Sequence, residues 1–270
     1  MKLRLPAWRL LACLLLNVLL SSYSAAAPAS MQQIMAQGEL RVGMSMATPW
    51  VMQAKDASLI GSEPDIARRL AADMGLTVKL VELPWPQLVP ALKQGRIDII
   101  ITGMAITPKL ALDVNFSHSY GESGIGIASH MEKTKNIKTM ADLQRASVKI
   151  ASVAGSSAEE LSKRLFKNAT LKTFYSISEA EQALVKGDVD VLIGPNAEMH
   201  FLSLRHPKII DQPVATPLLN TYEAFAVRKG DYDFINFLNA WIISRKADAW
   251  LDSTRYYWFK TLRWQGLVAP

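Results

Sequence analysis

The residues best placed to bind a ligand lie between Gly95 and Tyr120. Within this stretch, Ile97 to Ile101 is a short branched apolar run next to glycines, typical of a strand buried on both faces of a parallel sheet. Thr107 can then cap a helix, and Pro108 suits its first turn. A strand end that leads into a helix presents free backbone N–H groups to an anion or a polar ligand. The candidate ligand-binding residues of this turn are Thr102, Gly103, Met104 and Ala105.

Two tryptophans follow other predicted strands of the same unit. Trp50 comes after a predicted strand over residues 39–46, and Trp85 follows one over residues 77–82. Open α/β sheets bind ligands at the carboxyl ends of their strands. Each tryptophan could instead pack a loop, but two of them beside an N–H-rich turn favour a binding pocket.

The side chains that usually perform catalysis form no recognisable constellation. Glu63 is the only acidic candidate near the predicted pocket, and its place in the first turn of a helix explains it by electrostatics alone. The four histidines show no metal-ligand spacing, and neither H-E-x-x-H nor G-x-S-x-G occurs. We therefore expect no metal, no cofactor and no enzymatic activity.

The elements that must position these residues form two α/β units. The first has strands over 39–46, 77–82 and 97–101, with helices from Ile66 to Gly75 and over 87–93. Right-handed crossovers place its strands in one parallel sheet. A second unit repeats this order, with strands over 149–153, 170–175 and 189–194 and helices over 157–166 and 178–186.

Two further segments connect or complete these units. The segment Gly121 to Gly126 reads as a strand that crosses into the second unit, since its glycines do not have the spacing of a dinucleotide fingerprint. Residues 223–227 return to the first unit, where the amphipathic segment 232–250 packs.

The composition indicates an exported globular protein. The chain has 270 residues, half of them hydrophobic and a fifth charged. Basic residues precede an apolar run from Leu10 to Leu20, and small residues up to Ala27 suit signal peptidase. Residues 1–27 are thus a predicted signal peptide, and a retained membrane anchor is the alternative. Cys13 is the single cysteine, so the mature protein would have neither a disulfide nor a thiol nucleophile.

The charge of the chain does not favour nucleic acid as a partner. The formal net charge is +6, and three of the basic residues belong to the predicted signal peptide. No basic cluster with interleaved aromatic residues occurs.

The motifs resemble those of the extracellular solute-binding proteins of family 3, the receptors of amino-acid ABC importers. The likeness rests on GELRVG, LPWPQLVPALKQGRIDIIITGMAIT and VNFSHSY, and continues through VKIASVAGSSAEEL, GDVDVLIGPNAEMHFL and EAFAVRKGDYDFINFLNAWI. The resemblance implies two α/β lobes joined by two hinge strands, with a ligand held between them. It also implies that Ser156 and Ser157 contact the ligand's carboxylate, although either could simply cap the helix that follows.

The chain departs from the family at two positions whose side chains bind the amino-acid ligand in other members. Members carry an arginine for the ligand's α-carboxylate, and Leu110 occupies that position here; Pro195, followed by Asn196, replaces an aspartate that holds the α-ammonium. Charge-assisted hydrogen bonds contribute about 1.5 to 3 kcal/mol each, and Lys109 cannot form the planar fork of an arginine. We therefore expect a solute other than a standard free α-amino acid held in the usual way. An apolar wall of Trp50, Trp85, Met104 and Leu110 would suit a flat, weakly charged solute or a cation.

The sequence thus predicts a monomeric periplasmic protein that passes a small solute to the membrane subunits of an ABC importer. Lobe 1 would comprise residues 38–124 and 222–270, and lobe 2 residues 125–221. The candidate ligand-binding residues are Trp50, Glu63, Trp85, Thr102, Gly103, Met104, Ala105, Leu110, Ser156, Ser157 and Asn196. Two alternatives stay open: an accessory or sensor protein that contacts another periplasmic protein, and an enzyme similar to cyclohexadienyl dehydratase.

Overall fold

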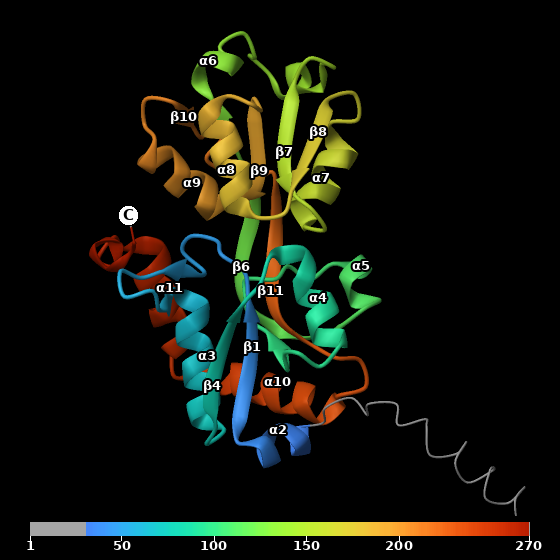
Figure 1. Cartoon of the computed structure of the whole chain (residues 1–270), viewed down its shortest axis with the longest axis vertical. Coiled ribbons are helices and arrows are strands. Elements are labelled where there is room, and N and C mark those ends of the chain that lie inside the picture. The colour runs from blue at the N-terminus through green and yellow to red at the C-terminus, as the bar shows by residue number, and fades with distance from the viewer. Residues whose placement is uncertain (1–30, 270) are drawn as a thin grey trace, which may run out of the picture.

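A computed structural model describes residues 31–269, and the predicted signal peptide with Cys13 lies outside the described residues. The protein has two α/β lobes, one above the other in Figure 1, connected by two long strands. The two-lobed fold predicted from the sequence is confirmed, whereas the residue limits given for the lobes stay a prediction. No helix in residues 31–269 is long and apolar enough to cross a membrane.

The sheet of lobe 1 is built around β1 (Glu39–Met44). This strand pairs in parallel with β4 (Thr77–Glu82) on one side and with β5 (Ile99–Ile100) on the other. Each isoleucine from Ile97 to Ile101 is fully buried, as the branched apolar run predicted. Both predicted strands are shorter in the structure: β1 ends at Met44 rather than at residue 46, and only two residues of the run pair.

Helices cover the two faces of this sheet. Those between its strands are α3 (Ser62–Asp73) and α4 (Trp85–Lys93), and the strand-to-helix turn after β5 leads into the short α5 (Pro108–Ala111). The Thr107 hydroxyl accepts the Leu110 N–H at 3.1 Å, so the predicted cap of this helix is confirmed. The other elements of lobe 1 are α2 (Met31–Gln37), β2 (Met52–Gln53), β3 (Leu59–Ile60), α10 (Tyr232–Ala247), α11 (Trp250–Lys260) and η2 (Gln265–Leu267).

Lobe 2 contains the predicted second βαβαβ unit. Its central strand β7 (Lys149–Val153) pairs in parallel with β8 (Thr170–Phe174) and β9 (Val191–Pro195). Helices α7 (Ser157–Leu165) and α8 (Ile177–Lys186) connect these strands, and α9 (Asn196–Arg205) follows β9 directly. The remaining elements are α6 (Met131–Thr134), η1 (Met140–Gln144) and β10 (Ile210–Asp211).

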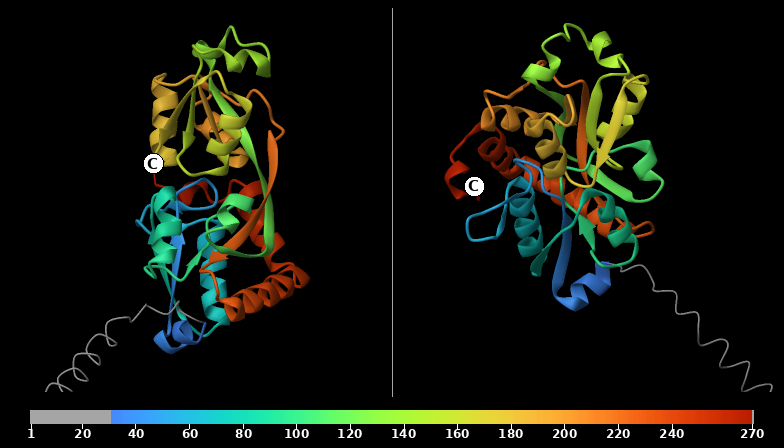
Figure 2. Two further views of the ribbon diagram at one scale, coloured as in Figure 1. Left: turned by 90° about the vertical axis from the view of Figure 1, so that its right-hand side faces the viewer. Right: turned by 45° about the horizontal axis from the view of Figure 1, so that its top comes forward.

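Two crossing strands, β6 (Asn115–His130) and β11 (Leu219–Val227), run between the lobes. They pair with each other antiparallel, and Figure 2 shows them side by side in both views. Because β11 also pairs with β5 and β6 also pairs with β9, the main strands of both lobes form one continuous sheet, in the order β4-β1-β5-β11-β6-β9-β7-β8. β10 pairs with β6 outside this order, and β2 and β3 pair only with each other. The predicted crossing strand at Gly121 to Gly126 is therefore part of a longer one.

The two lobes also touch away from the crossing strands. The Trp85 indole N–H points to the Gly155 carbonyl at 3.4 Å, and the Lys109 ammonium pairs with Glu160 at 2.8 Å. Phe201 of α9 packs in an apolar cluster with Met52, Trp258 and Trp264 of lobe 1. The structure therefore represents a closed arrangement of the lobes.

Candidate functional site

A cavity of about 80 Å³ lies between the lobes, beside the crossing strands. One wall comes from the ends of β1 and β5 and the start of α4, and the other from the ends of β7 and β9 and the first turn of α7. Both walls thus lie at the carboxyl ends of parallel strands, where α/β sheets bind ligands. The lining residues are Ser45, Met46, Ala47, Trp50, Trp85, Thr102, Gly103, Ala105, Ser123, Gly124, Ile125, Val153, Ser156, Ser157, Ala158, Ile177, Ile193, Gly194, Pro195 and Thr221.

The structure brings most of the sequence-derived candidates together around this cavity. Those that line it are Trp50, Trp85, Thr102, Gly103, Ala105, Ser156 and Ser157. They come from both lobes and from loops that are far apart in the sequence. Trp50 is almost completely buried, with an exposed fraction of 2%, while Trp85 is half-buried at the first position of α4.

Four candidates lie elsewhere. Met104 is buried in an apolar cluster of lobe 1 and does not line the cavity, although its neighbours Gly103 and Ala105 do. Leu110 packs against the same cluster. Asn196 lies in a separate groove, where its carbonyl accepts the Gln212 amide at 3.0 Å, and Glu63 is buried behind the cavity wall.

Of the four residues expected to form an apolar wall, only Trp50 and Trp85 line the cavity. Aliphatic residues of lobe 2 complete it, namely Val153, Ile177 and Ile193.

The hydroxyl groups around the cavity differ in what they already bind. The Thr102 hydroxyl accepts the Ser45 N–H at 2.9 Å and donates to the Ser45 carbonyl at 3.1 Å. The Ser156 hydroxyl accepts the Glu159 N–H at 3.2 Å and donates to the Val153 carbonyl at 2.7 Å, as an N-cap of α7. Both hydroxyls are therefore occupied within the protein.

Four other hydroxyls form no hydrogen bond to any described residue. They belong to Ser45, Ser123, Ser157 and Thr221, and all four residues line the cavity. Ser123 and Thr221 lie opposite each other on the crossing strands β6 and β11. These hydroxyls are available to a solute as donors and as acceptors.

Sequence reasoning missed three of these residues. Ser45 fell inside the predicted first strand, which in fact ends at Met44, and Ser123 lay within the predicted crossing strand. Thr221 precedes the segment that the sequence assigned to the return strand. A usable signal was available only for Ser123, because small residues on a strand that crosses between lobes leave room for a ligand.

The backbone N–H groups also differ from expectation. The Gly103 N–H, expected to be free for a ligand, donates to the Tyr120 hydroxyl at 3.1 Å. In lobe 2, by contrast, Ser157 and Ala158 occupy the first turn of α7 and line the cavity. The first N–H groups of a helix have no partner within the helix, so this turn can donate to a solute.

No residue that lines the cavity in the described part of the chain carries a charged or titratable acid or base. Pro195, where the resemblance implies an aspartate in other members, is part of the lining and contributes no charge. Nor do the histidine, cysteine, aspartate and glutamate residues within 31–269 form a group of three or more that could hold a metal ion. The cavity thus offers aromatic faces, aliphatic side chains and hydroxyls.

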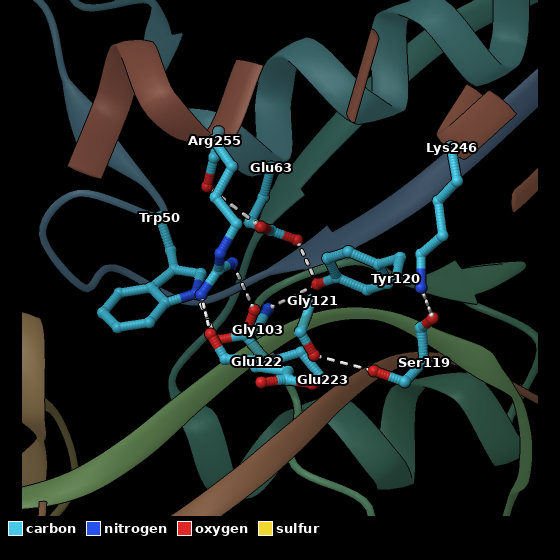
Figure 3. Close-up of polar contacts among 11 residues, drawn as sticks. Trp50, Glu63, Gly103, Ser119, Tyr120, Gly121, Glu122, Glu223, Lys246 and Arg255 are labelled. Atoms are coloured by element: carbon cyan, nitrogen blue, oxygen red, sulfur yellow. Dashed lines mark hydrogen bonds and ion pairs between the residues drawn. The ribbon is translucent and has the colours of Figure 1, made fainter. Parts of the chain in front are cut away.

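Two buried carboxylates lie directly behind this neutral surface (Figure 3). Glu63, in the first turn of α3, accepts hydrogen bonds from Tyr120 at 2.5 Å and from Ser62 at 3.0 Å. Glu223 on β11 accepts the Trp50 indole N–H at 2.8 Å and pairs with Arg255 at 2.8 Å. Burial, reinforced by the negative charge of Glu223, raises the pKa of Glu63 from 4.5 to about 7.

Comparison with known proteins identifies related sequences over most of the chain. Residues 40–261 match the bacterial extracellular solute-binding proteins, family 3. The ABC transporter glutamine-binding protein of Bacillus subtilis (strain 168) is 27% identical over 203 residues, which cover 74% of this chain and 72% of that protein. Cyclohexadienyl dehydratase of Pseudomonas aeruginosa is 23% identical over 256 residues, covering 94% of both chains.

A solved structure is similar over nearly the same length. It is the binding component of an ABC transporter from Wolinella succinogenes complexed with lysine, with a TM-score of 0.78 and 34% identity. The match covers 85% of this chain and 99% of that chain.

Proposed function

Because the chain belongs to family 3 of the bacterial extracellular solute-binding proteins, we propose that it captures a small solute in the periplasm for an ABC importer. The solute would be a small polar compound with little charge, rather than a standard free α-amino acid held by an arginine and an aspartate. Its partners would be the membrane subunits of the importer, and it would act as a monomer.

The observation that carries this proposal is the absence of charged side chains among the described residues that line the cavity. A zwitterion enclosed there would have both of its charges unpaired, and an unpaired buried charge costs several kcal/mol. Four hydroxyls and the first turn of α7 can instead bind a carbonyl, amide or hydroxyl group. Trp50 and Trp85 can hold a flat apolar part of the solute by stacking.

Binding would work through closure of the lobes. The cavity is lined from both lobes, so a solute makes its full set of contacts only in the closed form. It therefore shifts the equilibrium towards closure by its differential affinity for the two forms. The membrane subunits would recognise the closed form.

Thermal unfolding of the mature protein against a panel of solutes tests the proposal. The panel contains standard amino acids, amines, carboxylates, aromatic acids and neutral aromatic amides such as benzamide. A ligand at about 100 times its dissociation constant adds roughly 2.7 kcal/mol of stability, which raises the melting temperature by about 5 to 10 °C for a chain of this size. A shift with weakly charged members alone supports the proposal.

The other outcomes are equally informative. A clear shift with a standard α-amino acid would overturn the proposed solute class while leaving solute binding in place. Were no compound to produce a shift while a periplasmic protein co-purified in stoichiometric amount, the accessory-protein alternative would replace solute capture.

The similarity to a cyclohexadienyl dehydratase raises catalysis as a second candidate. General acid catalysis needs a titratable group within reach of the substrate. The described lining residues supply none, since the acids Glu63 and Glu223 are both buried behind the wall. We therefore expect no turnover of prephenate by the purified protein, and measurable turnover would restore the enzymatic alternative.

A further inference from the structure

The two carboxylates behind the cavity wall belong to one buried network (Figure 3). Glu63 has an exposed fraction of 0% and Glu223 of 1%, and neither touches the cavity. Burying two acids costs free energy unless hydrogen bonds and an opposite charge compensate them. The residues to which Glu63 and Glu223 are hydrogen-bonded therefore indicate the role of the network.

One branch of the network holds the Trp50 ring. Glu223 accepts the Trp50 indole N–H at 2.8 Å with one oxygen and the Arg255 guanidinium at 2.8 Å with the other. Phe259 packs edge-on against Trp50 and lies beneath the Arg255 guanidinium. A Cβ atom at Gly121 would lie only 2.7 Å from Arg255 Nη1 and 2.8 Å from Glu223 Oε2, so the crossing strand β6 packs tightly against this ion pair.

The second branch of the network holds the backbone of Gly103, another residue of the cavity wall. The Tyr120 hydroxyl donates to Glu63 at 2.5 Å and accepts the Gly103 N–H at 3.1 Å. Gly103 touches the edge of the Trp50 ring, because an added Cβ atom would lie 2.5 Å from Trp50 Cδ1. The two branches thus end on Trp50 and Gly103, two residues of the cavity lining that touch each other.

The network also connects the wall to both crossing strands. Tyr120 lies on β6 and Glu223 on β11, and Glu223 pairs directly with Gly121 in the antiparallel ladder. The charged and titratable groups that face Glu63 are Glu223, Arg255 and Tyr120. With both acids ionised and one guanidinium between them the cluster carries one net negative charge, and protonation of Glu63 makes it neutral.

We propose that Glu223 is a positioning residue of the solute cavity and that, together with Tyr120, it transmits the charge of Glu63 to Trp50 and Gly103. This inference rests on the proposed function, because it concerns the wall of the same cavity. Glu223 fixes the ring that a flat solute would stack on. Ionisation of Glu63 places a second negative charge beside Glu223, which changes how Glu223 shares its oxygens between Trp50 and Arg255.

The indole N–H resonance of Trp50 in solution NMR tests this proposal directly, with no solute present. Trp50→Phe assigns the resonance. In the unmodified protein we expect it to move with pH, with a midpoint near the raised pKa of Glu63, about 7. In Glu63→Gln the resonance should stay constant over the same range. In Glu223→Gln it should shift away from the position of a carboxylate-bound indole and lose its pH dependence.

Two controls separate positioning from a general loss of structure. Glu122→Gln removes an exposed acid next to Gly121 and should leave the Trp50 resonance and its midpoint unchanged. The Trp241 indole N–H, bound to Asp73 at 2.8 Å outside the network, should stay in place in every variant that folds.

The proposal is overturned if the Trp50 resonance keeps its position in Glu223→Gln, or keeps the same pH midpoint in Glu63→Gln. Should Glu223→Gln fail to fold, the pH titration of Glu63→Gln decides alone. Because no solute is added, a negative result here leaves the thermal-shift panel valid. Conversely, a panel without any stabilising compound leaves the NMR result standing.

Discussion

Gly103 shows how a single residue shapes the cavity wall. It has a φ of +65°, which disfavours any side chain, and its missing Cβ leaves the space that the edge of the Trp50 ring occupies. Its N–H is held by Tyr120. The glycine is thus required both by the backbone and by the tryptophan that packs on it.

We expect Gly103→Ala to destabilise the protein by about 1 to 3 kcal/mol and to weaken solute binding, because the new methyl group must displace the Trp50 ring. Gly95→Ala is the matched control, since Gly95 has a φ of +71° but no atom within 4 Å of an added Cβ. Urea unfolding should show a smaller loss for Gly95→Ala and an unchanged solute response. Equal losses and equal responses in the two variants would contradict this role of Gly103.

Glu63 should make stability depend on pH in an unusual direction for an acid. Its pKa is about 7 in the folded protein and 4.5 ordinarily, so between these values the unfolded chain has released the proton that the folded chain retains. The unfolded state then binds fewer protons, and the free energy of unfolding falls as pH rises, by on the order of 3 kcal/mol in total.

Glu63→Gln should remove this contribution. Urea unfolding of both proteins across this pH range measures the difference. The variant should gain stability relative to the unmodified protein as pH increases, and the gain should level off above pH 7. Two parallel stability curves would show that Glu63 does not titrate in this range.

At the scale of elements, α7 illustrates two uses of adjacent serines. The Ser156 hydroxyl caps the helix, whereas the Ser157 hydroxyl faces the cavity and forms no hydrogen bond to any described residue. The same strand-to-helix geometry occurs in lobe 1, but there the Gly103 N–H is taken by Tyr120. Of the two strand-to-helix turns, the one in lobe 2 therefore supplies the backbone donors that can reach a solute.

These two serines make a matched pair of variants. Ser156→Ala should lower the free energy of unfolding by about 1 kcal/mol through loss of the cap. Ser157→Ala should leave unfolding nearly unchanged and weaken solute binding roughly twofold to tenfold, the loss of one hydrogen bond. Calorimetric titration and urea unfolding of both variants measure the two effects. If Ser157→Ala binds the solute as well as the unmodified protein, its hydroxyl is not a ligand.

At the scale of the whole molecule, closure depends on contacts at several places around the cavity. Lys109 is exposed and Glu160 partly so, and ion pairs at the surface contribute about 0 to 1 kcal/mol. The contact of Phe201 with Trp258 and Trp264 is apolar and buried, so it should contribute more. Glu198 on α9 also accepts the Thr48 N–H from lobe 1, and burial raises its pKa well above the ordinary value.

We expect Phe201→Ala to shift the solute-free protein towards an open form, because it removes this apolar contact between the lobes. Small-angle X-ray scattering should show a larger radius of gyration, and the affinity for the solute should fall in proportion to the closed fraction. Leu204→Ala is the control, since Leu204 lies on the same helix but is 51% exposed. An unchanged radius in Phe201→Ala would mean that other contacts hold the lobes together.

The sequence by itself determined the βαβ order of the main strands and helices of both lobes, the two-lobed α/β fold and the family. These depend on local patterns: an apolar run such as Ile97 to Ile101 indicates a buried strand wherever it lies, and Thr107 with Pro108 caps a helix through its own neighbours. The same patterns were enough to bring Trp50 and Trp85 to one cavity, since both follow strands of one parallel sheet.

Only the tertiary structure decided which of the candidate groups can meet a solute. The Thr102 hydroxyl is hydrogen-bonded to the backbone of Ser45, 57 positions away in the sequence. Trp50 donates its indole N–H to Glu223, 173 positions away. Met104 packs into the core, although its neighbours Gly103 and Ala105 line the cavity, and Leu110 packs against the same apolar cluster. A side chain's partner across such distances depends on how strands and lobes are placed in space, and that placement is a property of the whole packed chain rather than of any local pattern.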